Sequence, residues 1–264
     1  MKTVRVRRPA VAGLFYPGNA AELRKTVEHL LALAPPAPGP FAKAIVAPHA
    51  GYVYSGPVAG SAYARVVAGR ERITRVVLLG PAHRTPVGAV AASSSNAFAT
   101  PLGHVPVDVE RRDALVEAGL VAVSDDAHAG EHSLEVQLPF LQVTLEDVAV
   151  LPLAVGHVEP ERVAGVLEAV WGGDETLVVV STDLSHYHDH ETATGLDRRT
   201  ADAVVAKRPD RLGPYDACGV VPLQGLLLAA GAHELSVELL DLRTSADTAG
   251  HPDRVVGYGA FALA

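Results

Sequence analysis

Three short apolar segments of the chain are each followed at once by side chains that can bind a metal ion or carry a proton. These side chains are His49, His83, Asp183 and His186. Imidazole titrates near neutral pH and is a common metal ligand, and a carboxylate can join it on the same ion. Ligands of open α/β sheets bind beyond the carboxyl ends of the strands. If the three segments are parallel strands, we therefore expect the four side chains to lie close together.

Cys218 is the single cysteine of the chain, against 12 histidines. A single cysteine excludes an internal disulfide and is typical of a reducing cytoplasm. Cys218 stands just before the apolar segment Val220–Ala230, and a helix N-terminus lowers the pKa of a thiol and favours the thiolate. The alternative is a small buried apolar residue, the commonest role of a free cysteine. Beside His49 and His83, Cys218 makes a plausible three-ligand set with open positions for water or substrate.

His132 and Glu135 stand three residues apart, so in a helix they would share one face. One interpretation is a pair that transfers protons or orients a substrate. The alternative is a capping segment in which Glu131 or Ser133 accepts hydrogen bonds from helix amides. His157 also follows an apolar segment and competes for the same edge of the sheet.

The elements that position these residues alternate between short β-branched runs and longer amphipathic segments. Strands are expected over Lys43–Ala47, Arg75–Leu79, Val148–Leu153, Thr176–Ser181, Val237–Arg243 and Val255–Leu263. Helices are expected over Ala20–Leu33, Asp108–Ala118, Glu159–Trp171, Glu191–Lys207 and Gly219–Ala230. Asn19 and Asp108 are the expected N-caps and Gly231 a C-terminal stop, while Ser55 and Pro57 are expected to open a further helix. This alternation predicts an α/β fold with a largely parallel sheet.

Composition limits the classes of function. Of the 264 residues, 48% are hydrophobic. The chain has 22 Lys and Arg against 30 Asp and Glu, which gives a net charge of −8. This charge argues against general electrostatic binding to nucleic acid or to an anionic membrane. Apolar runs stay well short of a membrane span. The basic start Met1–Arg8 lacks the apolar stretch of a secretion signal, so a cytoplasmic protein is expected. The Pro-rich patch Pro35–Pro40 is too short to separate domains, and we expect one domain over residues 1–264.

The chain resembles the Memo family of the AmmeMemoRadiSam group. The matching segments are RRPAVAGLFYP (Arg7–Pro17), APHAGYVYSGPVA (Ala47–Ala59), LLGPAH (Leu78–His83), EHSLEVQLPFL (Glu131–Leu141), STDLSHY (Ser181–Tyr187) and ACGVVPL (Ala217–Leu223). The resemblance implies a fold similar to class III extradiol (LigB-like) dioxygenases, an α/β sandwich around a central, mostly parallel mixed sheet. It also implies a functional link to a radical SAM protein and to an AMMECR-like protein.

The same resemblance implies a ligand set. His49, His83 and Cys218 match the metal-binding positions of the family. Asp183 and His186 match residues that line the same cavity, with Asp183 as an additional ligand, and His132 matches a position near it. The related dioxygenases hold ferrous iron with two histidines and a carboxylate. A thiolate in place of the carboxylate argues against plain ring cleavage and suits Fe(II) or copper redox chemistry.

The leading hypothesis is therefore a non-haem Fe or Cu enzyme of the redox or oxygenase type. In it His132 and His186 move protons, and Asp183 orients a ligand or binds the metal. One alternative is an adaptor that keeps the cavity and binds phosphorylated peptides, although Arg7, Arg8 and Arg84 are the only basic residues near the cavity motifs.

The other alternative is a zinc hydrolase with an activated water. It would be favoured by a glutamate such as Glu135 close to the metal. The sequence lacks the Gly-x-Ser-x-Gly signal of serine hydrolases and the usual nucleotide-binding loops.

Overall fold

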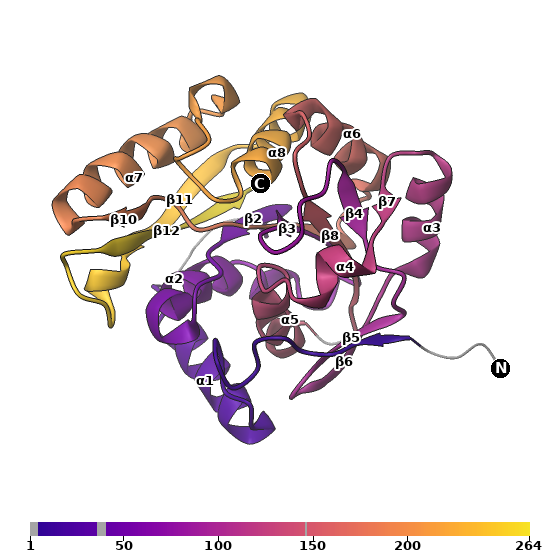
Figure 1. Ribbon diagram of the computed structural model, residues 1–264, viewed down its shortest axis with the longest axis horizontal. Coiled ribbons are helices and arrows are strands. Elements are labelled where there is room, and N and C mark those ends of the chain that lie inside the picture. The colour runs from indigo at the N-terminus through magenta and orange to yellow at the C-terminus, as the bar shows by residue number, and fades with distance from the viewer. Residues whose placement is uncertain (1–4, 36–40, 146) are drawn as a thin grey trace.

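A nine-stranded mixed sheet forms the centre of the protein (Figure 1). The computed structural model describes residues 5–35, 41–145 and 147–264. The strands are β1 (Val6–Arg7), β2 (Ala44–Ala47), β3 (Arg75–Pro81), β4 (Val90–Ala92), β5 (Ala97–Thr100), β6 (Gly103–Pro106), β7 (Ala122–Val123), β8 (Ala149–Val155), β9 (Thr176–Ser181), β10 (His186–His188), β11 (Val237–Thr244) and β12 (Val255–Leu263).

Across the large sheet the strands follow in the order β10, β12, β2, β9, β3, β8, β4 and β7, and β11 pairs with β12. The four central strands β2, β9, β3 and β8 are mutually parallel, whereas β12 and β4 are antiparallel to their neighbours in this group. The prediction of an α/β fold with a mostly parallel central sheet is confirmed. Strands β1, β5 and β6 form a separate three-stranded sheet.

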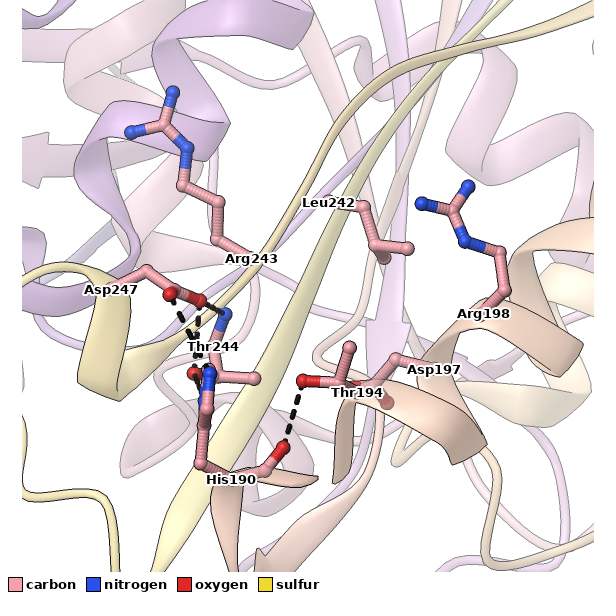
Figure 2. A pocket seen from close by; sticks show the side chains of 8 residues that line it. All are labelled: His190, Thr194, Asp197, Arg198, Leu242, Arg243, Thr244 and Asp247. Carbon is pink, nitrogen blue, oxygen red and sulfur yellow. Dashed lines mark hydrogen bonds and ion pairs between the residues drawn. The ribbon is translucent and has the colours of Figure 1, made fainter. Parts of the chain in front are cut away.

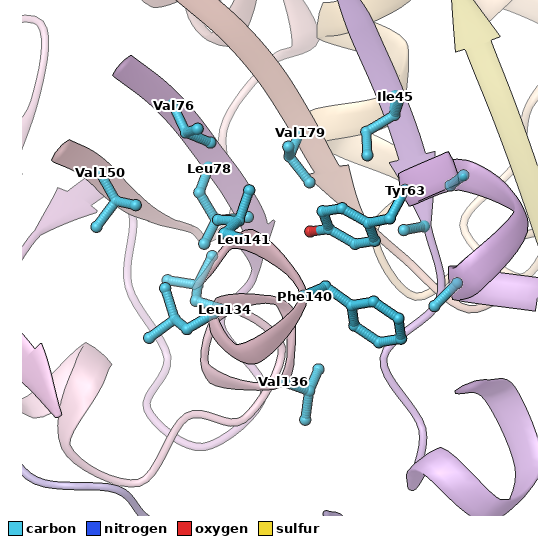
Figure 3. Packing of buried hydrophobic residues seen from close by; sticks show 14 of the residues in the cluster. Ile45, Tyr63, Val76, Leu78, Leu134, Val136, Phe140, Leu141, Val150 and Val179 are labelled. Carbon is cyan, nitrogen blue, oxygen red and sulfur yellow. The ribbon is translucent and has the colours of Figure 1, made fainter. Parts of the chain in front are cut away.

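Helices cover both faces of the large sheet. They are α1 (Ala20–Ala32), α2 (Tyr52–Ala64), α3 (Val109–Glu117), α4 (Asp125–Ala129), α5 (Leu138–Thr144), α6 (Pro160–Val170), α7 (His190–Val205) and α8 (Val220–Ala232), with the short 3₁₀ helices η1 (Val67–Gly69), η2 (Glu135–Gln137), η3 (Pro209–Arg211) and η4 (Ser245–Asp247). Alternate strand residues face opposite layers: Leu78 belongs to the cluster under α1, α2 and α5, and Leu79 to the cluster under α6, α7 and α8. Figure 3 shows Tyr63 and Phe140 packed over the first of these faces.

Side-chain caps mark the N-termini of α1, α3, α4 and α7, whereas α2, α5, α6 and α8 begin without one. Asn19 accepts hydrogen bonds from the amides of the first turn of α1, and Asp108 does the same for α3. The stop expected at Gly231 is wrong, because α8 continues to Ala232 and the residue with a left-handed backbone is Glu234.

The start expected for α2 is also wrong. Helix α2 begins at Tyr52 and contains Pro57 in its interior. The amide of Tyr52 donates to the carbonyl of Phe15, and the hydroxyl of Ser55 donates to the carbonyl of Ala50. These contacts begin the helix directly after the His49 loop, before the residues that the sequence pattern favours.

Gly60 sets the close approach of α1 and α2, and its replacement by alanine is expected to lower the free energy of unfolding by about 1–3 kcal/mol. A Cβ at this position would overlap the backbone carbonyl of Leu30, which cannot move without shifting α1. Gly165→Ala in α6 is the matched control, since a Cβ there meets no atom within 4 Å. It is expected to stabilise the protein by up to about 1 kcal/mol. Urea unfolding of both variants checks the prediction, and equal effects would contradict it.

Among the described residues, no helix is long and apolar enough to cross a membrane. A cytoplasmic location and a single domain over residues 1–264 stay predictions. Residues 36–40 of the Pro-rich patch lie outside the described residues.

Candidate metal centre

Three histidines meet beyond the carboxyl ends of the central strands. His49 follows β2, His83 follows β3, and His132 lies in the segment between α4 and η2. One imidazole nitrogen of each lies within 4.8 Å of those of the other two, and the ring centroids are 4.9–5.4 Å apart. His49 is buried, whereas the side chains of His83 and His132 are 29% and 15% exposed. The group can hold a metal ion and is open to solvent on one side.

The hydrogen bonds of the His49 ring assign its tautomer. The hydroxyl of Ser181 donates to the carbonyl of Ser133 at 2.6 Å, so this oxygen must act as an acceptor toward Nδ1 of His49, 3.0 Å away. It also accepts a hydrogen bond from Nε2 of Gln137 at 2.8 Å. Nδ1 of His49 therefore carries the proton, and Nε2 keeps a lone pair that can bind a metal.

Glu131 orients the other two histidines. Its carboxylate lies 3.0 Å from Nδ1 of His83 and accepts the backbone amides of His83, His132 and Ser133. Burial raises the pKa of Glu131, but the hydrogen bonds from His83 and Ser133 outweigh it and hold the pKa well below its usual value. An ionised Glu131 makes Nδ1 of His83 a donor and leaves its Nε2 free. Nδ1 of His132 is buried, 3.4 Å from Glu131 Oε1, without a hydrogen bond among the described residues.

Two of the three imidazoles are held neutral. Burial, followed by the nearby His83, lowers the pKa of His49 to about 3. Burial and then His49 lower the pKa of His132 to about 4. Because a metal ion binds the neutral imidazole, His49 and His132 need lose no proton before binding at neutral pH.

Cys218 and Asp183 lie next to His49, Cys218 half-buried and Asp183 buried. Sγ of Cys218 is 3.3 Å from Nε2 of His49, and the carboxylate of Asp183 accepts the backbone amide of His49 at 2.7 Å. His186 lines the same cavity of about 550 Å³ as Cys218, and its Nδ1 lies 2.8 Å from the carbonyl of Leu184. The structure thus brings His49, His83 and His132 together, with Cys218 beside His49.

Residues 7–262 match the family described as Memo-like protein. The chain belongs to this family. A MEMO1 family protein of Methanopyrus kandleri is 39% identical over 279 residues, which cover 97% of this chain and 98% of the relative. MEMO1 family proteins of Methanothermobacter thermautotrophicus and Aquifex aeolicus are each 36% identical, over 96–97% of this chain and 98% of their own lengths.

The thiol of this Memo-like protein is not acidic, and the expectation of a lowered pKa at the start of α8 is wrong. Burial, and then the neighbouring Asp183, raise the pKa of Cys218 to about 12. Hydrogen bonds from the amides of Asp183 and Gly219 oppose the shift without reversing it. The loss of solvation outweighs the helix terminus, so the thiol is protonated unless a metal displaces its proton.

Glu135 does not pair with His132 in this Memo-like protein. Its fully buried carboxylate forms an ion pair with Arg7 and accepts hydrogen bonds from the Tyr16 hydroxyl and from the amides of Ala10 and Val11. Glu135 therefore ties the N-terminal segment to the base of the site. The capping interpretation is wrong as well: Glu131 accepts the amides of the two residues that follow it, which lie before η2, and the N-cap of η2 is Leu134, without a side-chain hydrogen bond.

Glu131 is the functional residue that the sequence reasoning missed. It stands directly before His132 in the segment EHSLE, and the sequence pattern indicates only its capping role. A carboxylate next to one candidate ligand is the available signal that a second imidazole could be oriented there.

Asp197 of α7 supports the segment that carries Asp183 and His186, because it accepts the amide of Ser185 at 2.9 Å. Burial raises the pKa of Asp197, so ionising it costs stability as the pH rises above its unfolded value of about 4. Asp197→Asn removes this cost and keeps an acceptor. We expect the melting temperature of the variant minus that of the wild type to increase from pH 4 to pH 7. Asp202→Asn, an exposed change on the same helix, is the control. A difference that stays constant with pH would contradict the prediction.

Proposed function

We propose that this Memo-like protein is a metal-dependent redox enzyme of the oxygenase type that uses Fe(II) or copper. The observation that supports it most is the group of three histidines, in which Ser181 and Glu131 orient His49 and His83 so that both Nε2 atoms keep a lone pair for a metal ion. When bound, an Fe(II) or copper ion would supply one-electron chemistry and open positions for oxygen and substrate.

Within this proposal, His49, His83 and Cys218 are ligands and His132 is a fourth. Sγ of Cys218 and Nε2 of His49 are 3.3 Å apart, close enough for both atoms to bind one metal ion. The buried Nδ1 of His132 lacks a hydrogen bond among the described residues, and this supports His132 as the fourth ligand. The thiol must lose its proton to bind, so metal affinity is expected to fall at acid pH.

His186 and Asp183 are the proposed proton-transfer groups. The ring of His186 is held through Nδ1 by the carbonyl of Leu184, which leaves Nε2 as the proton acceptor. Burial raises the pKa of Asp183, the hydrogen bond from His49 opposes the shift, and the carboxyl can therefore hold a proton more readily than an exposed one. The likeness to class III extradiol dioxygenases and the link to radical SAM and AMMECR-like proteins stay predictions.

Metal analysis of protein purified without an affinity tag tests the proposal. We expect about one Fe or Cu ion per chain, and a loss of affinity of about tenfold or more in Cys218→Ser and His132→Ala. His104→Ala, an exposed histidine of β6, is the control and should bind as the wild type does. Absence of Fe and Cu, with binding unchanged in Cys218→Ser, would overturn the proposal. Zinc occupancy would favour the hydrolase, and tight peptide binding that survives His49→Ala would favour the adaptor.

A further inference from the structure

Within the described part of the chain, no hydrogen bond at Nδ1 fixes the direction of the His132 imidazole. This nitrogen is buried, and the carboxylate of Glu131 lies 3.4 Å from it. His49 and His83 each have an acceptor 3.0 Å from Nδ1 instead. The direction of the His132 ring therefore depends on the side chains that pack against it.

A histidine of α7 shows how a hydrogen bond fixes such a ring. His190 lines a cavity of about 420 Å³ between α7 and β11 (Figure 2). The hydroxyl of Thr244 donates to Asp247 at 3.0 Å, so its oxygen accepts from Nδ1 of His190, 2.9 Å away. The His190 ring is held in one direction although its side chain is 42% exposed. His132 must be held in another way.

Three rings lie next to that of His132 among the residues that the structure describes, those of His49, His83 and Phe15. Their centroids are 5.4, 4.9 and 4.9 Å from the centroid of the His132 ring. Aromatic rings attract one another at centroid separations of about 4.5–7 Å when they are tilted or offset. His49 and His83 are proposed ligands themselves. Phe15, inclined at 59° to His132, is therefore the ring that can orient this imidazole independently of a metal ion.

The backbone of the N-terminal segment fixes Phe15 on both sides. The amide of Phe15 donates to the carbonyl of Val11 at 2.9 Å, and its carbonyl accepts the amide of Tyr52 at 2.7 Å, at the start of α2. The next residue, Tyr16, is buried and donates its hydroxyl to Glu135 at 2.6 Å. The Phe15 ring, half-buried against the hydrophobic core, thus has a fixed base from which to contact His132.

We propose that Phe15 is a positioning residue of the metal centre, whose ring holds the imidazole of His132 toward those of His49 and His83. The inference rests on the proposed function through the role of His132 as a ligand. A phenyl ring restricts the rotation of the imidazole and has no polar atom that would compete for its lone pair. Without this ring, His132 must give up rotational freedom when it binds a metal ion, and the affinity for the ion falls.

Titration of the metal-free protein with Co(II), followed by the visible absorption of the bound ion, tests the proposal. We expect an affinity about tenfold weaker in Phe15→Ala, the lower end of the effect of residues that orient metal ligands. The absorption bands should also change, because water replaces an imidazole in part of the complexes. Phe15→Tyr keeps the ring and should restore the affinity and the spectrum of the wild type.

Phe41→Ala is the matched control. Phe41 is also half-buried against the same hydrophobic cluster, but it packs next to Gly69 and has no contact with the three histidines. Its replacement removes the same ring from the core and should lower stability to a similar extent. It should bind Co(II) with the affinity and the spectrum of the wild type.

Wild-type affinity and spectrum in Phe15→Ala would overturn the proposal, and so would equal weakening by Phe15→Ala and Phe41→Ala, since that result indicates a loss of stability alone. If circular dichroism shows that Phe15→Ala does not fold, Phe15→Val decides the test and should bind Co(II) more weakly than Phe15→Tyr. Absence of Co(II) binding in the wild-type protein would overturn the metal centre itself and this inference with it. The two failures are therefore distinguishable.

Discussion

Replacement of His49 by alanine is expected to lower metal affinity by more than about 100-fold, since outer-shell partners alone are worth about 10–100-fold. His49 is buried at the centre of the site: its ring packs against those of His83 and His132, and its Nε2 faces Cys218. Among the described residues, the group contains no further histidine that could provide a ligand nitrogen at this position. Metal content after dialysis, and competition with a chelator of known affinity, measure the loss.

His157→Ala is the control for this variant. His157 also follows a strand of the parallel group, β8, but it is exposed and lies outside the three-histidine group. Its replacement should leave metal binding unchanged. Ser181→Ala tests the tautomer assigned to His49, with an expected loss of about 10–100-fold. Full metal occupancy in His49→Ala, with the wild-type affinity, would show that the three histidines are not the metal site.

The largest expected effect on stability is that of Glu135→Ala, a loss of about 3–5 kcal/mol in the free energy of unfolding. The side chains of Glu135 and Arg7 are 0% and 5% exposed, so the substitution leaves a buried guanidinium without its counter-charge. It also removes the acceptor of the Tyr16 hydroxyl and of two backbone amides. Urea unfolding at neutral pH measures the change.

Asp210→Ala provides the comparison. It breaks the ion pair between Arg208 and Asp210, in which the side chains are 46% and 59% exposed, and should change the free energy of unfolding far less than Glu135→Ala does, because solvent screens exposed pairs. Similar losses in the two variants would contradict the argument from burial. A loss confined to Glu135→Ala would support the buried Glu135 carboxylate, through its ion pair and hydrogen bonds together, as the anchor of the N-terminal segment.

The portion of the site that lies at strand ends could be predicted from the sequence. β2 and β3 are short, apolar and parallel, so His49 and His83 must reach the same edge of the sheet. Asp183 follows β9 for the same reason, and the backbone amide of His49 donates to it. In each case the position of the side chain depends on the strand alone.

The rest of the site depends on tertiary contacts that leave no periodic signal. His132 lies outside the strands, and its position is set by Glu131, whose carboxylate also holds His83 from a distant segment of the chain. The place of Cys218 before α8 predicts an acidic thiol, but its pKa depends on burial, which the local sequence does not show. Hydrogen bonding of this kind joins residues of several loops, and single-sequence patterns do not encode it.

The hydroxyl of Ser181 determines which nitrogen of His49 can exchange a proton. It donates a hydrogen bond to the backbone carbonyl of Ser133 and accepts hydrogen bonds from His49 and Gln137, so each of its hydrogen-bonding positions is filled. His49 therefore cannot exchange a proton through Nδ1 toward the interior, and every gain or loss of a proton takes place at Nε2. Acid and base, like the metal ion, must reach this imidazole through the same side of the ring. Protonation and metal binding at His49 are mutually exclusive events on one atom.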